Sequence, residues 1–342
     1  MRRETTKPGE DFETALARSA ERLDDVCRRM REAGCHDGPL RGPGDHHLAT
    51  GGKRLRARLT LAAGLRLGIG EADALAAATA VELVHNASLV HDDLMDGDTH
   101  RRGHWSVWAR DGTGAALLLG DRFLAGAYAQ AATTSRPGVL VALLSDRVRT
   151  LVDGQARESE PLDPAASGES LQARYLATAR AKAGALFALP IEAALCLASV
   201  PEATRQTATE AFEAVGTAYQ VLDDLDDLEG TKDGRERAAD LWQGRLNAPA
   251  TQYLVSAPAA DAAALRRWLR DGPRDGETVA MWRDRLLESD APASARRLHD
   301  LLIDDACARA RDLPEPLHDL LDWTARAVAR KATPMPAPTV ED

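Results

Sequence analysis

Two acidic segments carry the residue types and the spacing of a metal site. The first reads DDLMD at residues 92–96, and the second reads DDLDD at residues 223–227. Residues four apart share one face of a helix, where like charges destabilise the helix by about 0.2–0.5 kcal/mol. Paired carboxylates are typical ligands of Mg²⁺, which also takes phosphate oxygens. The repeated pattern therefore predicts Mg²⁺ and a phosphorylated substrate, although a single such segment is equally typical of a solvated helix end.

Two basic segments have the composition of phosphate sites. GGKRLR at residues 51–56 places a glycine turn and three cations at a predicted helix start, where backbone N–H groups and the helix dipole favour anions. RRG at residues 101–103 follows the first acidic segment and offers guanidinium groups that bind phosphate through two hydrogen bonds. Each segment alone is also typical of a solvated face. Their combination with paired acidic segments is much more specific.

Helices are the elements that must position these residues. Aromatic residues make up only 4% of the chain, and alanine and leucine dominate, which favours helix over strand. Apolar residues recur at helical spacing before each acidic segment. We expect roughly a dozen helices of ordinary length and no strand pair. Residues 11–332 are expected to form one all-α domain between disordered ends at 1–10 and 333–342.

The composition excludes several classes of protein. The net charge of −10 argues against a general nucleic-acid-binding protein, which needs a basic surface. No apolar run is long enough to span a bilayer, and no secretory signal is visible. The four cysteines show no CxxC spacing. We therefore expect a cytoplasmic protein without a membrane span.

In their order and spacing, the four segments resemble the trans-isoprenyl diphosphate synthase (polyprenyl synthetase) family. The resemblance rests on GGKRLR, VHNASLVHDDLMD, RRG and YQVLDDLDD, and it extends from about Gly51 to Pro249. It implies an all-α, isoprenoid-synthase-type helical bundle around a deep central cavity, and a homodimer. It also implies Mg²⁺-assisted condensation of isopentenyl diphosphate with an allylic prenyl diphosphate, giving an all-E polyprenyl diphosphate.

The resemblance also implies a role for individual residues. Two acidic segments would face each other across the cavity mouth, with the metal ligands Asp92, Asp93, Asp96, Asp223, Asp224 and Asp227. The implied catalytic residues are Asp92, Asp96, Asp223, Asp227, Lys182 and Gln220. The implied ligands of isopentenyl diphosphate are Lys53, Arg56, His85 and Arg102. On the allylic side, the implied ligands are Arg101, Arg235 and Arg245.

Several positions depart from the family pattern. Ala183 stands where relatives have threonine, and His104-Trp105 replaces a basic residue and proline. Arg235 and Arg245 stand where relatives have lysine, and Asn247 replaces a threonine. The arginines keep the charge but not the geometry of lysine. These departures affect the allylic side and leave the isopentenyl diphosphate residues intact.

Small residues before the first acidic segment bear on product length. By the resemblance, the growing chain passes Val84, Ala87 and Ser88, and none of these is bulky. We expect a product of C20 or longer, with geranylgeranyl diphosphate the foremost candidate. A bulky side chain from another helix could still close the path.

Two other functions are compatible with the same segments. A class I terpene cyclase of this fold would ionise a prenyl diphosphate without condensation, but it needs no isopentenyl diphosphate pocket. A non-catalytic partner subunit would typically have lost an acidic motif. The preferred primer, the final chain length and the pathway stay open.

Overall fold

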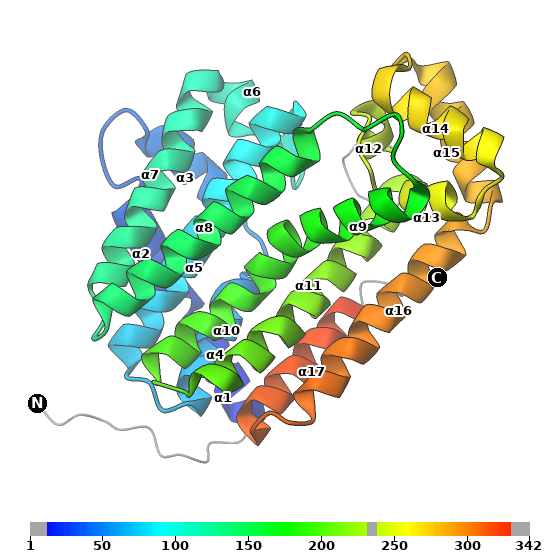
Figure 1. Cartoon of the computed structure of the whole chain (residues 1–342). Helices are drawn as coiled ribbons and strands as arrows, with labels where there is room; N and C mark the ends of the chain where they lie inside the picture. The colour runs from blue at the N-terminus through cyan, green and yellow to red at the C-terminus, as the bar shows by residue number, and fades with distance from the viewer. Residues whose placement is uncertain (1–11, 231–237, 330–342) are drawn as a thin grey trace, which may run out of the picture.

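The computed structural model describes residues 12–230 and 238–329, and nearly all of this part is helical (Figure 1). The prediction of an all-α fold is confirmed. The ends expected to be disordered, 1–10 and 333–342, lie outside the described residues. No helix in the described part is long and apolar enough to cross a membrane.

The helices are more numerous than expected because several are short. The first half of the chain contains α1 (Phe12–Glu21), α2 (Leu23–Gly34), α3 (Arg41–Ala49), α4 (Leu55–Arg66), α5 (Glu71–Asp96), α6 (Val107–Asp111), α7 (Thr113–Ala132) and α8 (Pro137–Ser159). The second half contains α9 (Gly168–Ala179), the π-helical segment η1 (Arg180–Gly184), α10 (Ala185–Leu197), α11 (Glu202–Glu229), α12 (Ala239–Trp242), α13 (Ala248–Ser256), α14 (Ala259–Asp271), α15 (Gly276–Glu288), α16 (Ala291–Ala310) and α17 (Glu315–Ala329).

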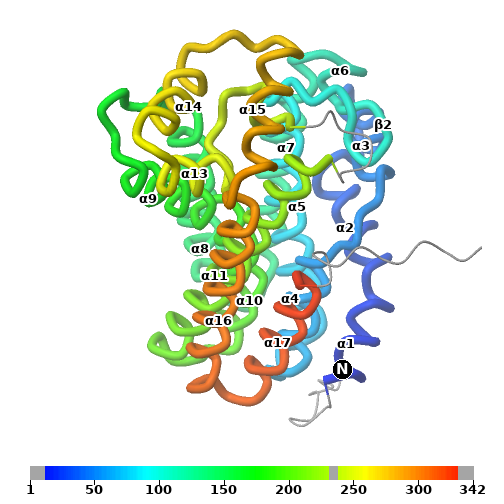
Figure 2. The backbone as a smooth tube through the Cα atoms, turned by 90° about the vertical axis from the view of Figure 1, so that its right-hand side faces the viewer, coloured from blue at the N-terminus to red at the C-terminus, as the bar shows by residue number. Residues whose placement is uncertain are grey.

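The long helices run side by side, and short elements gather at one end of the bundle (Figures 1 and 2). That end carries α3, α6 and α12–α15, whereas α1 and α17 lie toward the other end. Helix α10 is buried along its whole length, and α5 buries an alanine-rich run from Ala74 to Ala80. Such small side chains allow helices to approach closely. Helices α5 and α11 both lead into the end with the short elements.

One short strand pair departs from the expectation of none. Strands β1 (His100–Arg101) and β2 (His104–Trp105) pair antiparallel. The two residues between them, Arg102 and Gly103, have φ angles of 53° and 77°. Two consecutive residues with positive φ are the signature of a type I′ hairpin turn. The strand pair thus depends on its turn. It does not contain a run of β-branched residues, from which the composition would have predicted strands.

Both helices with acidic segments end at a glycine in the left-handed region. Gly97 follows α5 with φ of 70°, and the N–H of Asp98 donates to the carbonyl oxygen of Asp93 at 2.9 Å. Gly230 follows α11 with φ of 77°. The last turn of a helix carries partial negative charge. The acidic segments thus add negative carboxylates at helix ends, where the helix dipole already disfavours negative charge.

A π-helical segment joins α9 to α10 and packs closely on α11. A Cβ atom at Gly216 of α11 would lie 2.6 Å from the carbonyl oxygen of Ala183 and 2.8 Å from the Cα of Gly184. Only a glycine at position 216 therefore allows α11 to lie this close to the π-helical segment. Lys182 lies in the π segment, and such bulges are frequent at functional sites.

Candidate active site

In the first acidic segment, Asp93 forms an internal ion pair. Its side chain is buried, and the Nε of Arg101 donates to its two carboxylate oxygens at 2.7 and 2.9 Å. Burial lowers the pKa of Arg101, but the contact with Asp93 outweighs it and raises that pKa overall. Asp93 and Arg101 were expected on the metal and the diphosphate, and the structure places them against each other.

Asp92 and Asp96 are half-buried and occupy one face of the end of α5. The pKa of Asp92 is raised to about 6, mainly by burial. Lys182 opposes this rise, and the negative charges of Asp96 and Glu158 add to it. A cation bound at this face would offset both the cost of burying a negative charge and the repulsion between the carboxylates.

In the second acidic segment, Asp224 is hydrogen-bonded to residues of the surrounding helices. Its carboxylate accepts hydrogen bonds from the hydroxyl of Tyr175 at 2.6 Å, from Nε2 of Gln220 at 2.8 Å and from the N–H of Ala248 at 2.8 Å. Burial raises the pKa of Asp224 to about 6, although the three hydrogen bonds oppose this rise. Asp224 thereby joins α9, α11 and the start of α13.

The segment after α11 connects the two acidic segments. The N–H of Asp240 donates to Oδ2 of Asp227 at 3.2 Å. A few residues later, Nε2 of Gln243 donates to the carbonyl oxygen of Asp96 at 2.8 Å, and Arg245 forms an ion pair with the Asp96 carboxylate. Residues 238–245 therefore run from the end of α11 to the end of α5. Arg235 lies outside the described residues.

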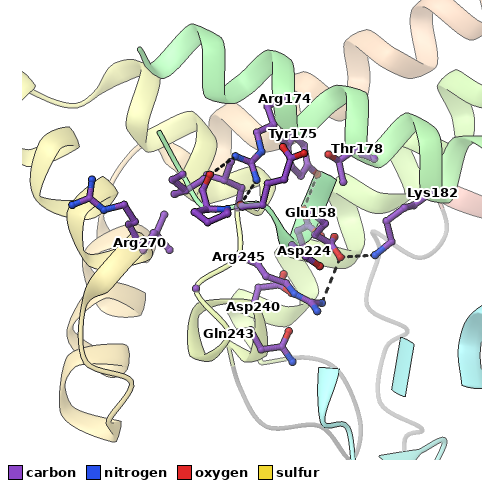
Figure 3. A pocket seen from close by; sticks show the side chains of 18 of the residues that line it. Glu158, Arg174, Tyr175, Thr178, Lys182, Asp224, Asp240, Gln243, Arg245 and Arg270 are labelled. Atoms are coloured by element: carbon purple, nitrogen blue, oxygen red, sulfur yellow. Dashed lines mark hydrogen bonds and ion pairs between the residues drawn. The ribbon is translucent and has the colours of Figure 1, made fainter. Parts of the chain in front are cut away.

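Glu158 joins two of the predicted cations. Nζ of Lys182 lies 2.6 Å from Oε2 of Glu158, and Nη1 of Arg245 lies 3.7 Å from the same oxygen (Figure 3). Burial lowers the pKa of Lys182, but Glu158 and Asp92 outweigh it and raise that pKa overall. Since Arg245 also pairs with Asp96, the charges alternate from Asp96 to Lys182.

Sequence reasoning missed Glu158, although the sequence holds a signal for it. Glu158 lies in the last turn of α8, where the helix dipole disfavours a negative charge. An acidic residue at such a position is favoured when cations lie nearby. Tyr175 was also missed, because a lone tyrosine on an apolar helix is typical of a core.

A cavity of about 680 Å³ opens beside these charges (Figure 3). The predicted residues that line it are Lys182, Gln220, Asp224 and Arg245. Glu158 lines it as well, and Arg174 and Arg270 extend the wall toward α14. The cavity therefore adjoins the cations of the predicted allylic site.

The predicted isopentenyl diphosphate residues include a half-buried pair. Nη1 of Arg56 lies 3.1 Å from Nε2 of His85. Arginine can only donate, so Nε2 accepts and the proton of the neutral imidazole is on Nδ1. Burial and the charge of Arg56 hold the pKa of His85 well below its usual value. In the described part of the chain, neither Nδ1 of His85 nor Nε of Arg56 has a hydrogen-bond partner.

Aromatic rings support this pair from α10 and α11. The guanidinium of Arg56 lies 5.4 Å from the ring centre of Phe187, whose ring lies 5.2 Å from that of Tyr219. Burial lowers the pKa of Arg56. A guanidinium whose Nε–H is buried without a partner is a favourable position for an anion.

The remaining predicted cations lie around the glycine turn. Arg102 donates to the carbonyl oxygen of Gly51, and a Cβ atom at Gly52 would lie 2.6 Å from Nη1 of Arg102. Lys53 is exposed. The pKa of Arg102 is lowered by burial and by the charges of Arg54 and Arg101. Several positive charges therefore lie close together near this turn.

The three residues expected to set product length lie on α5. Val84 and Ala87 are buried, and Ser88 is half-buried. Oγ of Ser88 donates to the carbonyl oxygen of His85 at 2.9 Å, so its own helix satisfies the hydroxyl. All three are small or apolar neighbours of the acidic end of α5.

Within residues 12–230 and 238–329, no three histidine, cysteine, aspartate or glutamate side chains gather closely enough to hold a metal ion by themselves. A cation at this site would thus need oxygen ligands from elsewhere, such as a diphosphate.

The contacts of Asp224 make a stability prediction. Replacing Asp224 with asparagine turns one acceptor into a donor that faces other donors, which should lower the free energy of unfolding by about 1–3 kcal/mol. Asp223→Asn, at the half-buried neighbouring position, is the control and should change it by less than about 0.5 kcal/mol. Urea denaturation measures both. Equal losses in the two variants would contradict the structural role of Asp224.

Comparison with known proteins shows which family the chain resembles. A family model described as polyprenyl synthetase matches residues 38–284. The (2E,6E)-farnesyl diphosphate synthase of Mycobacterium tuberculosis is 35% identical over 226 residues, which are 64% of this chain and 61% of that protein. The octaprenyl diphosphate synthase of Haemophilus influenzae is 29% identical over 240 residues, which are 69% of this chain and 71% of that protein.

The fold is that of solved polyprenyl synthases. The crystal structure of a decaprenyl diphosphate synthase from Rhodobacter capsulatus superposes with a TM-score of 0.81 at 24% identity, covering 94% of this chain and 100% of that chain. The named relatives make products of different lengths, so the family does not specify product length. On its motifs, its fold and the family match over residues 38–284, this chain belongs to the polyprenyl synthetase family.

Proposed function

We propose that the chain is a Mg²⁺-dependent prenyltransferase that condenses isopentenyl diphosphate with an allylic prenyl diphosphate. The product is an all-E polyprenyl diphosphate of C20 or longer, with geranylgeranyl diphosphate the foremost candidate. The observation that carries the proposal is the alternating set Asp96, Arg245, Glu158 and Lys182 beside a cavity. Cations and carboxylates from four elements meet there, as a metal–diphosphate site requires.

The carboxylates fit Mg²⁺ by their chemistry. Hard oxygen donors suit this ion, and the raised pKa of Asp92 indicates negative charge in need of a cation. We assign the metal to Asp92, Asp96, Asp223 and Asp227. Asp93 and Asp224 are buried, and both carboxylate oxygens of each accept hydrogen bonds from other side chains, so we give them supporting roles. When bound, Mg²⁺ stabilises the negative charge of the leaving diphosphate.

On the allylic side, Lys182 and Arg245 supply the cations for the diphosphate. Both are held by Glu158, which fixes their positions before substrate arrives. Nε2 of Gln220 donates to Asp224, so the amide oxygen of Gln220 is the end left to face a positive carbon. Arg101 supports this side through Asp93.

On the other side, Arg56, His85, Lys53 and Arg102 hold isopentenyl diphosphate. The unpartnered Nδ1–H of His85 and Nε–H of Arg56 are donors for its oxygens. The neutral imidazole can donate without adding charge to a region already positive. Lys53 is exposed, so its ammonium group is accessible to a diphosphate that arrives from solvent.

The two sides together permit a head-to-tail condensation. The allylic C–O bond breaks, and its electron pair leaves with the diphosphate. The double bond of isopentenyl diphosphate then attacks the allylic carbon, and a proton is lost, which the released diphosphate can accept. Apolar helices exclude the water that would otherwise capture the cation.

An assay of condensation tests the proposed function. Radiolabelled isopentenyl diphosphate is incubated with Mg²⁺ and a series of allylic primers, and the products are separated by length. Chain-extended diphosphates are expected. Hydrocarbons formed from a prenyl diphosphate alone would identify a cyclase instead. No product with any primer would favour a partner subunit, and either result overturns the proposal.

The homodimer implied by the family resemblance is part of the proposal. Exposed apolar side chains support it: Leu117 and Leu118 on α7, and Val152 on α8. Apolar side chains exposed on neighbouring helices are typical of a surface that another protein covers.

Product length gives a second prediction. Ala87→Phe should shorten the main product by one or more isoprene units, because the ring would fill the path below the acidic end of α5. Ser88→Ala keeps a small side chain next to it and should leave the product length unchanged. Chromatography of the dephosphorylated products measures both. A folded, active Ala87→Phe enzyme with unchanged products would refute this assignment of the cavity floor.

A further inference from the structure

A buried ion pair lies outside both acidic segments. Nη1 of Arg54 lies 3.4 Å from Oε1 of Glu82, and only 8% and 3% of the two side chains are exposed. Glu82 stands in the apolar run of α5, where a charged residue is rarely tolerated without a partner. Removing one partner of such a pair leaves a buried charge uncompensated.

The same two side chains tie three elements together. The second carboxylate oxygen of Glu82 accepts from the N–H of Ala57 at 3.2 Å, in the first turn of α4. Nη2 of Arg54 donates to the carbonyl oxygen of Leu48 at 2.9 Å, near the end of α3. Glu82 on α5 thus fixes where α4 begins, and Arg54 fixes the preceding turn to α3.

The backbone of this turn needs such support. Arg54 has φ of 45° and ψ of 39°, which is the left-handed region, and Gly51 and Gly52 before it have φ of 78° and 124°. A non-glycine residue in that region costs on the order of 1–3 kcal/mol. The contacts of its side chain therefore hold Arg54 in a conformation that the chain alone disfavours.

Two more buried residues complete the network. Oδ1 of Asn86 lies 3.4 Å from Nη1 of Arg54 and 3.1 Å from Nε2 of His47. Nδ2 of Asn86 donates to the carbonyl oxygen of Glu82 at 2.7 Å. Burial and the charge of Arg101 lower the pKa of His47 to about 3, so its imidazole is neutral and Nε2 donates to Asn86.

We propose that Glu82 is a positioning residue for the isopentenyl diphosphate site. It lies one turn before His85 on α5, and the N–H that it binds belongs to the residue after Arg56. Its partner Arg54 follows Lys53 directly. One buried carboxylate thus fixes Lys53, Arg56 and His85 relative to one another. This inference rests on the proposed function, and Glu82 acts through Arg54 and Ala57 without touching substrate.

The charge of Glu82 supports the same role. Arg54, Arg56 and Arg102 gather near the glycine turn, and the negative charge of Glu82 raises the pKa of both Arg56 and Arg102 against burial. Glu82 therefore offsets the repulsion within this cluster and holds it in place while its outward donors remain available. An amide at the same position keeps the shape but not the charge.

The test compares Glu82→Gln with Glu192→Gln. Glu192 belongs to a separate buried ion pair, in which Nε of Arg147 donates to Oε2 of Glu192 at 2.6 Å, and it lies on α10 outside the proposed machinery. Steady-state kinetics give KM for each substrate, and thermal unfolding gives stability. Glu82→Gln should raise KM for isopentenyl diphosphate at least tenfold and leave KM for the allylic substrate within twofold. Glu192→Gln should lose stability and leave both values within twofold.

A second variant covers the case in which Glu82→Gln does not fold. Arg54→Lys keeps the charge but loses the forked contact to Glu82, Asn86 and Leu48. It should raise KM for isopentenyl diphosphate severalfold with the same selectivity. Equal changes in both KM values, or a loss of kcat alone, would overturn the positioning role.

Binding without turnover separates this inference from the proposed function. Calorimetry measures the affinity of isopentenyl diphosphate for the wild-type chain and the variants in the absence of an allylic substrate. Wild-type binding that weakens at least tenfold in Glu82→Gln supports the inference. Equal binding in both refutes it. If the wild-type chain neither binds isopentenyl diphosphate nor condenses it, the proposed function itself fails.

Discussion

The structure depends on one electrostatic constraint, which is that two helices end in carboxylates. The end of a helix already carries partial negative charge, and α5 and α11 each place an acidic segment there. Nearby cations offset this charge: Arg101 at Asp93, Arg245 at Asp96, and Lys182 near Asp92. The fold brings these cations from a hairpin, a loop and a π-helical segment to one end of the bundle. A site crowded with both signs of charge is suited to a metal and a diphosphate.

Neighbouring residues in each acidic segment do different work. Asp93 and Asp224 are buried and hydrogen-bonded, and each joins its helix to another element. Their neighbours Asp92 and Asp223 are more exposed. Helical geometry explains the division, because adjacent residues point about 100° apart and only one of them can face the cavity mouth. Elsewhere on α5, one turn before His85, Glu82 faces inward to Arg54.

The sequence was sufficient for the helical fold and for the motifs of the candidate site, but it did not predict the pair of Asp93 with Arg101. Periodic apolar residues and low aromatic content predicted α5 and α11, and the family resemblance implied that Arg56 and His85 serve the same site. The hairpin at Arg102 was missed because its stability comes from two residues of positive φ. Glu158 was missed because its partners, Lys182 and Arg245, are 24 and 87 residues away along the chain. Contacts between residues so far apart in the chain depend on how the helices pack, and a local sequence pattern does not predict that packing.

The central claim is that carboxylates from both helices bind the same metal–diphosphate unit. Crystals grown with Mn²⁺ and inorganic pyrophosphate test it most directly, because anomalous scattering locates Mn²⁺ unambiguously. The account predicts Mn²⁺ bound by Asp92 and Asp96 on one side of the pyrophosphate and by Asp223 and Asp227 on the other. Mn²⁺ confined to one helix, or pyrophosphate bound away from Lys182 and Arg245 with no metal beside it, would contradict the account.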